Sequence, residues 1–256
     1  MYGGGQRGSF SDMILTSMLS YRLQFYILSH HLAETLVSGY LRMIYSIRND
    51  RLEMRTIQPS EPMLAWVSFL EMQVWPNCRS QVVEIFYRQC TVGSIDTGDI
   101  GEMVAALIFM FSFDKKQRTD VNGPMPQTVY EFLASLFGDH VVSSAGLDSN
   151  KTGERMVWLM MNGFVCFNHF VRLEGPVNDT VLRQAWGRGT ALFTYPGTAY
   201  FDIIIPVAIP DDNEMSYIII QGDQLTKGLE NEANFDISRA AKKYPSQYLP
   251  RPAWAS

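Results

Sequence analysis

The stretch that decides the fold runs from Phe201 to Gln221 and reads FDIIIPVAIPDDNEMSYIIIQ. Its two arms are rich in Ile, Val and Tyr, whereas residues 210–214 between them are turn formers with nothing apolar to bury. This pattern predicts a β-hairpin whose strands are built to be buried. The hairpin nevertheless carries a carboxylate, Asp202, in its first arm and a carboxamide, Gln221, at the end of its second.

Both polar side chains need an explanation. Strand alternation predicts that Asp202 shares a face with Ile204, and that Gln221 shares a face with Asp223. A buried carboxylate without a partner costs several kcal/mol, so we expect Asp202 to face an ion, a hydrogen-bond network or a solvated cleft. From the spacing alone, a salt bridge or an edge position is the more common explanation.

Composition indicates a globular protein. The 256 residues are 46% hydrophobic and 18% charged, which is ample material for a core. The formal net charge of -5 argues against a protein that coats nucleic acid nonspecifically, although a local basic groove can coexist with it. No segment offers the roughly 18 apolar residues of a spanning helix, and the N-terminus lacks the apolar core of a secretory signal, so we expect no membrane partner.

The cysteines point to a compartment. Cys78, Cys90 and Cys166 are odd in number and lack metal-ligand spacing, which favours free thiols over a disulfide framework. We therefore expect an intracellular protein of the cytoplasm or nucleus.

Helical spacing dominates the first half of the chain. Apolar residues recur every three or four positions from Asp12 to about Ile47, which predicts one long helix or two, broken at Ser38-Gly39. Pro59 marks a loop, and a second helical region follows from Met63 to Val74. The basic stretch between these regions is expected to be a solvated face, with phosphate contact as the weaker alternative; it contains Arg42, Arg48, Arg51 and Arg55.

Residues 103–113 predict a helix that is apolar nearly all round and therefore buried in the middle of the fold. Glu102 lies in its first turn and shares a face with Ala106, Phe109 and Phe113. A carboxylate at this position also simply complements the helix dipole, and spacing cannot reject that explanation.

The second half mixes helices and strands. The expected elements are a helix at 127–137, a loop at 146–153, an ambiguous segment at 156–161, a strand at 164–171, a helix capped by Asn178 or Asp179, and a strand at 190–195. His169 lies on one face of its strand with Val165 and Phe167, where a lone histidine is more often packed or exposed than catalytic. Buried helices followed by mostly antiparallel strands predict an α/β (α+β) fold with a small mixed sheet.

Several short segments together carry a family resemblance. They are PSEP at 59–62, GEMVA at 101–105 leading to Asp114, FNHF at 167–170, RGTA at 188–191, DIIIPV at 202–207 and IIQ at 219–221. In this order they resemble the restriction-endonuclease-like C-terminal domains of mostly basidiomycete fungal Crinkler-type and related proteins. The resemblance runs from about Leu32 to Gln221. It implies a helical N-terminal region at 1–58 and a restriction-endonuclease-like domain at 59–256 that is shortened at its C-terminus.

The resemblance also implies a site. In a PD-(D/E)xK core, a helix Glu, a strand Asp and a Glu or Gln on the next strand hold a divalent ion, and the matching positions are Glu102, Asp202 and Gln221. Mg²⁺ or Mn²⁺ held there would polarise a phosphate and supply a water of lowered pKa, with DNA as the substrate. The P-loop ATPase that often precedes such domains has no counterpart, because no G-x-x-x-x-G-K-[ST] string occurs.

The chain departs from the family pattern at one catalytic position. The lysine that offsets transition-state charge belongs two residues after Gln221, and Asp223 stands there. Losing one well-placed electrostatic donor commonly costs about a hundredfold in rate. Asp223 as a further ion ligand, or a cation from Lys227 or Arg188, would be a rescue. We therefore expect a degenerate nuclease-like protein with low or no activity that acts as a binding or interaction module, with an active Mg-dependent DNA endonuclease as the alternative.

Overall fold

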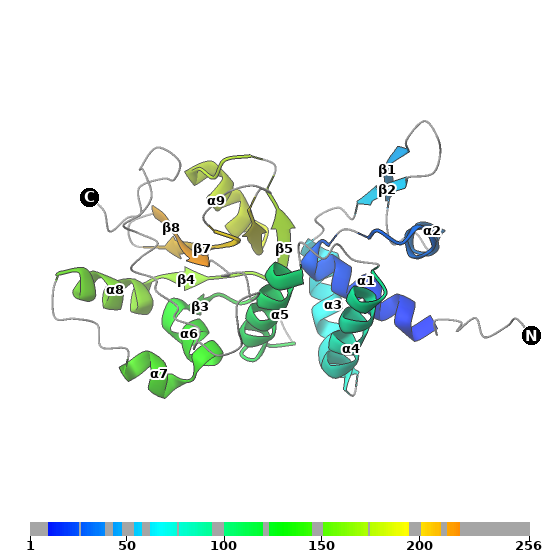
Figure 1. The fold of residues 1–256 in the computed structure, drawn as a ribbon. Helices are drawn as coiled ribbons and strands as arrows, with labels where there is room; N and C mark the ends of the chain where they lie inside the picture. The colour runs from blue at the N-terminus through cyan, green and yellow to red at the C-terminus, as the bar shows by residue number, and fades with distance from the viewer. Residues whose placement is uncertain are drawn as a thin grey trace, which may run out of the picture. The chain divides into compact units, whose positions relative to one another are not determined.

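The computed structural model describes residues 10–25, 27–38, 43–47, 54–57, 62–75, 77–93, 100–119, 123–144, 151–173, 175–194, 201–210 and 214–220. Contacts along the chain divide it into two compact units, Met1–Ile100 and Gly101–Ser256. The boundary predicted after residue 58 therefore lies inside the first unit. Figure 1 colours the elements of both units by residue number.

The described part of the first unit holds helices and one hairpin. The elements are α1 (Phe10–Leu23), α2 (His30–Ser38), β1 (Met43–Ile47), β2 (Met54–Ile57), α3 (Pro62–Val74) and α4 (Cys78–Thr91). The second helical region agrees with the prediction, whereas the loop expected around Pro59 lies outside the described residues. α1 packs against both α3 and α4, and the ring of Trp66 stacks on that of Phe69 with the centroids 4.6 Å apart.

The prediction of a helix as far as Ile47 was wrong. Residues 24–29 separate α1 from α2, and residues 43–47 form β1, which pairs antiparallel with β2. Met43 and Ile47 are four residues apart, and residues so spaced share a face in a strand as well as in a helix. The spacing therefore fits both structures, and the β-branched and aromatic residues between Met43 and Ile47 favour the strand.

The second unit is an α/β structure, which confirms the predicted fold class. Its elements are α5 (Ile100–Asp114), β3 (Gln127–Thr128), α6 (Val129–Phe137), α7 (Asp139–Ser144), α8 (Lys151–Asn162), β4 (Phe164–Val165), β5 (His169–Arg172), α9 (Asp179–Gly187), β6 (Thr190–Phe193), β7 (Ile203–Ile209) and β8 (Glu214–Ile220). The strands form one mixed sheet in the order β3-β4-β7-β6-β5, and β8 pairs with β7. β5 and β6 are parallel and α9 connects them, whereas β6, β7 and β8 are antiparallel.

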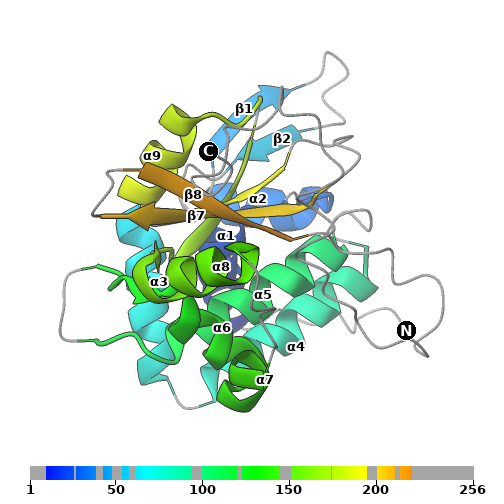
Figure 2. The same ribbon diagram turned by 90° about the vertical axis from the view of Figure 1, so that its left-hand side faces the viewer.

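Helices cover both faces of this sheet. Leu182 and Ala185 of α9 belong to a buried cluster with Leu192, Ile204 and Met215 of the strands. Aromatic rings pack elsewhere in the unit, where Phe113 of α5 and Phe132 of α6 meet Phe167, whose ring in turn contacts Phe170 of β5. Figures 1 and 2 agree that α9 lies on one face of the sheet, and α6 and α8 on the other.

The predicted hairpin is confirmed. β7 and β8 pair antiparallel from Ile203 opposite Ile220 to Ile209 opposite Glu214. The other edge of β7 has two partners, because β6 pairs with Ile203 and Ile204 while β4 pairs with Val207 and Ala208.

Pro206 lies in the gap between these two partners of β7. The Thr194 N–H donates to the Asp202 carbonyl, so the next pair, Phe193 and Ile203, is a non-hydrogen-bonded pair. The backbone groups of Ile203 therefore point toward β8, and those of Ile204 point toward β6. By the same alternation, the amide position of residue 206 points away from β8. Proline has no N–H to donate, and no described strand pairs with residue 206 on that edge. A buried strand therefore tolerates a proline at this point.

Of the other predictions for the second unit, some are confirmed and some are wrong. The ambiguous segment at 156–161 is helical, and the loop expected at 146–153 is wrong in its last residues, since α8 begins at Lys151. The strand expected at 164–171 is split into β4 and β5, which join different neighbours. α5 is less buried than predicted, because Val104 and Ile108 are 40% and 51% exposed. Asn178 caps α9 as predicted, its side-chain oxygen accepting from the Val181 N–H.

Two coarser expectations also bear on function. Within the described ranges, no helix is both long and apolar enough to cross a bilayer. Cys78, Cys90 and Cys166 are free cysteines, as predicted.

Candidate functional site

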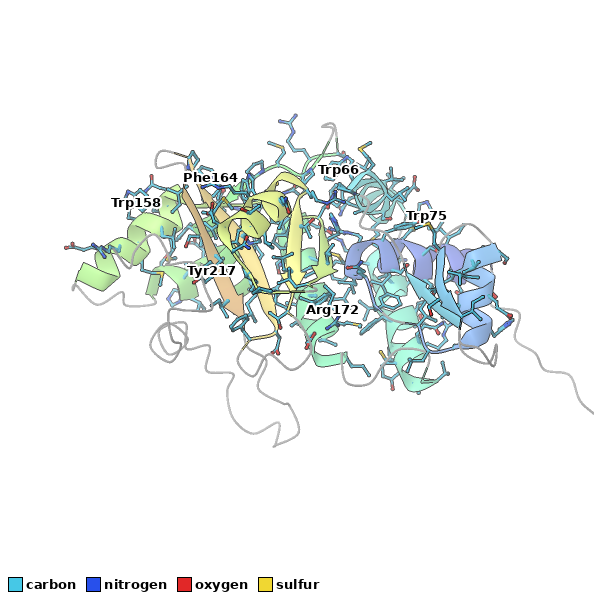
Figure 3. All side chains as sticks on the ribbon, turned by 90° about the horizontal axis from the view of Figure 1, so that it is seen from above. Trp66, Trp75, Trp158, Phe164, Arg172 and Tyr217 are labelled. Carbon is cyan, nitrogen blue, oxygen red and sulfur yellow. The ribbon has the colours of Figure 1, made fainter. Side chains whose placement is uncertain are left out.

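One end of the sheet gathers the polar residues of interest. Register places Arg172 of β5 opposite Phe193 of β6, Phe193 opposite Ile203 of β7, and Ile203 opposite Ile220 of β8. Strands β5, β6 and β8 end in this row, and β7 begins there. Carboxyl ends of parallel strands are a common place for ligands. Figure 3 labels Arg172 at this end and Phe164 at the opposite end.

Asp202 was predicted to lie within the strand, but it lies directly before it. Its side chain is only partly buried. Its N–H donates to the carbonyl of Ile220 and its carbonyl accepts from the Thr194 N–H. Since Ile203 is also opposite Ile220, two successive residues face one residue of β8, which is the pattern of a β-bulge. Bulges interrupt strand alternation, so the predicted sharing of a face with Ile204 does not carry over to Asp202.

Glu102 lies in the first turn of α5, as predicted, and its carboxylate has a specific partner. Its Oε2 lies 3.6 Å from a terminal guanidinium nitrogen of Arg172, with side chains 24% and 9% exposed, respectively. The Arg172 guanidinium also lies over the ring of Phe193, 5.4 Å from the centroid. The helix carboxylate is therefore tied to the sheet end through a largely buried arginine, and dipole complementation alone no longer accounts for it.

The structure tests only part of the predicted ligand set. Glu102 and Asp202 are both linked to this end of the sheet, but at different strands: Glu102 contacts Arg172 of β5, whereas the backbone of Asp202 bonds to Ile220 of β8 and to Thr194, which follows β6. Gln221, Asp223 and Lys227 lie outside the described residues. Arg188 follows α9 directly and precedes β6, so its backbone is at the end of β6 away from Phe193.

A divalent ion fits the described residues poorly. Across the described ranges, no group of three His, Cys, Asp or Glu side chains is placed to hold a metal ion. At an effective dielectric constant of about 20, a unit positive charge 4 Å from a divalent ion repels it by on the order of 8 kcal/mol. Arg172 would impose such a repulsion on any ion bound by Glu102, so the residues present do not match a Mg²⁺ or Mn²⁺ centre.

His169 is packed, consistent with the expectation that it is not catalytic. It is 1% exposed, and its two ring nitrogens lie 2.6 Å from Asn168 Oδ1 and 3.1 Å from Thr190 Oγ1. With the Asn168 oxygen as acceptor, Nδ1 carries the proton and Nε2 accepts from the Thr190 hydroxyl. The bond between His169 and Thr190 links β5 to β6, since these two residues are paired in the parallel ladder.

Sequence reasoning missed Arg172 altogether. The predicted strand ended at Val171, one residue short, so the arginine was not connected with any acidic position. A signal was present, because an arginine that closes an otherwise apolar strand is a natural candidate for a buried ion pair.

Comparison with known proteins identifies one family for the chain, and its description assigns no function. A family model described as Domain of unknown function (DUF8736) matches residues 4–249. No curated protein and no solved structure matches the chain.

Proposed function

The chain belongs to the DUF8736 family, and we propose that it is a nuclease-like binding module that holds DNA without cleaving it. The observation that carries the proposal is the pairing of Glu102 with Arg172. A metal-dependent nuclease uses its helix carboxylate to attract a cation, whereas here a guanidinium already neutralises that carboxylate. The restriction-endonuclease-like assignment of the second unit is part of the same proposal.

A second departure supports the loss of cleavage. Asp223 stands where the resembling family has a lysine. A carboxylate there reverses the charge beside an anionic transition state, and Arg172 raises the cost of the metal that would compensate for it. An active endonuclease therefore needs two separate repairs in this chain.

The proposed setting is intracellular, in the cytoplasm or nucleus. Free thiols at all three cysteines support a reducing compartment. With a net charge of -5, DNA binding would rely on a local basic surface rather than on the total charge, so affinity should fall steeply with salt.

The test combines binding and cleavage on the full chain. We expect fluorescence anisotropy to detect DNA binding that is equal in EDTA and in Mg²⁺, and gels to show no cutting of plasmid or single-stranded DNA with Mg²⁺ or Mn²⁺. Asp223→Lys alone should also stay inactive, because Glu102 keeps its arginine. Brisk metal-dependent cutting that disappears in Asp202→Ala would instead establish the active endonuclease. Absence of DNA binding at low salt would leave the proposal without a ligand and refute it.

A further inference from the structure

We propose that the outer edge of β8 is a dimerisation surface, at which a second copy of the chain adds its own β8 and the two sheets become one. In the described sheet, β8 pairs with β7 alone. The edge of a strand that lacks a neighbour presents a row of N–H and C=O groups, which another strand can satisfy. The inference goes beyond DNA binding and does not depend on it.

Strand alternation identifies the backbone groups at this edge. Ile203 directs its N–H and C=O toward β8, so its register partner Ile220 directs its own toward β7. The same holds for every second residue back to Glu214, whereas Met215 and Ile219 lie between them and direct their backbone groups away from β7. Neither Met215 nor Ile219 makes a further backbone hydrogen bond to a described residue. An incoming strand can therefore bond to both.

The side chains of β8 also leave apolar surface for a further strand. Ile218 and Ile219 point to opposite faces of the sheet, and both are partly exposed. Their register partners on β7, Ile205 and Ile204, are 0% exposed. A strand added beside β8 would bury what Ile218 and Ile219 still expose, and the burial of apolar area favours association.

The usual protections of a sheet edge are missing from β8. Natural edges are kept from pairing by shortness, charge, proline or a bulge. The edge strands β5 and β3 have four and two residues, respectively. In contrast, β8 has seven residues, keeps one register along β7, and carries no charged residue or proline from Met215 to Ile219. Figure 2 shows β8 with α9 above it and α8 below it, and these helices belong to the two faces of the sheet.

A second copy is the partner that this strand fits, because β8 is complementary to itself. A two-fold axis through Tyr217 places Met215 of each copy opposite Ile219 of the other, where the N–H of each residue meets the C=O of its counterpart. On the other face of the sheet, Ser216 of each copy lies opposite Ile218. No charges of like sign meet along these pairs. Since only one short strand of each copy takes part, we expect a dissociation constant in the micromolar range.

Ile219→Pro is the informative variant. Proline removes the outward N–H but no bond to β7, and strand edges tolerate proline where the N–H faces solvent. We expect sedimentation velocity on the full chain to show dimers of the wild type as its concentration rises, and Ile219→Pro to weaken the dimer at least tenfold. Ile219→Val is the matched control, because it keeps both the N–H and a β-branched side chain, and it should dimerise like the wild type.

Amide hydrogen exchange on the wild type tests the pairing residue by residue. We expect the protection of the Met215 and Ile219 amides to rise with protein concentration. The amide of Ile218 bonds to β7 already, so its protection should stay constant. If Ile219→Pro does not fold, this difference between neighbouring amides decides the question.

Three outcomes would overturn the inference. A wild type that stays monomeric at the highest soluble concentration has no such surface: slow exchange at Ile219 would then show that the chain covers the edge itself, and fast exchange that the edge serves another partner or none. Dimers that a folded Ile219→Pro leaves intact would form elsewhere on the molecule. Protection at Ile219 that does not change with concentration would exclude β8 from the dimer. DNA binding is measured separately, so its failure would refute the proposed function alone.

Discussion

At Gly163, where α8 gives way to β4, there is no room for a side chain. A Cβ at this position would lie 2.6 Å from the Leu159 carbonyl oxygen and 2.8 Å from a methyl carbon of Val207. The backbone is also fully used, since the Gly163 N–H donates to Leu159 and its carbonyl accepts from the Val129 N–H. The backbone of residue 163 therefore cannot retreat without breaking the joint between α6, α8 and β7.

We expect Gly163→Ala to lower the free energy of unfolding by about 1–3 kcal/mol, the usual cost of overpacking a core. Chemical denaturation measures the change. Gly175→Ala is the control, because a Cβ at Gly175 meets nothing within 4 Å, and it should be nearly neutral. Equal effects of the two substitutions would show that the contacts at Gly163 relax freely.

The buried thiol of Cys166 makes the free energy of unfolding depend on pH in the alkaline range. Burial raises the pKa of its thiol from the usual 9.0 to about 12. Between these values the unfolded chain has lost the proton and the folded chain keeps it, so stability is full below pH 9 and falls as the pH rises toward 12. One such group contributes a slope of about 1.4 kcal/mol per pH unit.

We expect Cys166→Ala to flatten the decline in unfolding free energy between pH 9 and 12, measured by denaturant titration at several pH values. Tyr217 contributes a similar decline above pH 10, because burial raises its pKa to about 12, so part of the slope should remain. A wild-type stability that is constant from pH 8 to 12 would contradict both assignments.

Single residues also show how far the site could be foreseen. Glu102 was found because an acid in the first turn of an apolar helix stands out in the sequence. Arg172 was not, since its partner is 70 positions away and nothing local in the sequence records such a pairing. The position of Asp202 was off by one residue, because a bulge has no reliable signature among repeated isoleucines.

At the level of elements, α6 shows a helix start that depends on two side chains. The Thr128 hydroxyl accepts from the Glu131 N–H, and the Glu131 carboxylate accepts from the Thr128 N–H, which is a capping box. The second of these bonds is the main reason why the pKa of Glu131 lies below its usual value.

We expect Thr128→Ala to cost about 1 kcal/mol in the free energy of unfolding, and Thr128→Ser to cost much less. A lowered carboxyl pKa stabilises the fold above the unfolded pKa, and that contribution is lost as pH falls through the folded value. The N–H that mainly lowers the pKa of Glu131 belongs to the backbone of residue 128 and remains in Thr128→Ala, so the acid-side loss should persist in this variant. Unfolding curves at pH 7 and pH 3 measure both effects, and an identical cost for Ser and Ala would exclude the cap.

Elements differed in how well sequence could anticipate them. The hairpin of β7 and β8 was clear because both arms are long, apolar and separated by turn residues. β1 was mistaken for helix because Met43 and Ile47 fit either period. β4 and β5 were merged because the residues between them are buried as well, so no polar break marks the change of neighbour.

On the scale of the whole molecule, the three thiols report on both units at once. Cys78 and Cys166 are buried, whereas Cys90 is partly exposed, and burial raises the pKa of all three. We expect Ellman's reagent to label Cys90 before the buried Cys78 and Cys166, with all three labelled at one rate in denaturant. Labelling of Cys166 as fast as Cys90 in the native protein would contradict the packing of the second unit.

The arrangement of the sheet lay beyond sequence reasoning. The mostly antiparallel pairing of the strands was expected and is confirmed, but the parallel pairing of β5 with β6 through α9 and the two partners on one edge of β7 were not foreseen. Such choices depend on long-range pairing that single-sequence patterns do not encode. The fold class was accessible because composition and periodicity alone favour helices packed on a sheet.

Pro206 has a consequence for mutational tolerance. Proline is normally the residue that a buried strand rejects, yet at the gap between β6 and β4 every other residue type would add an N–H directed where no described strand accepts it. Substitution at Pro206 would lower the stability of the fold because it adds an N–H donor, not because it removes a contact. This holds even for a valine of nearly the same volume. The usual ranking of amino acids for strand interiors is thus inverted at this one position.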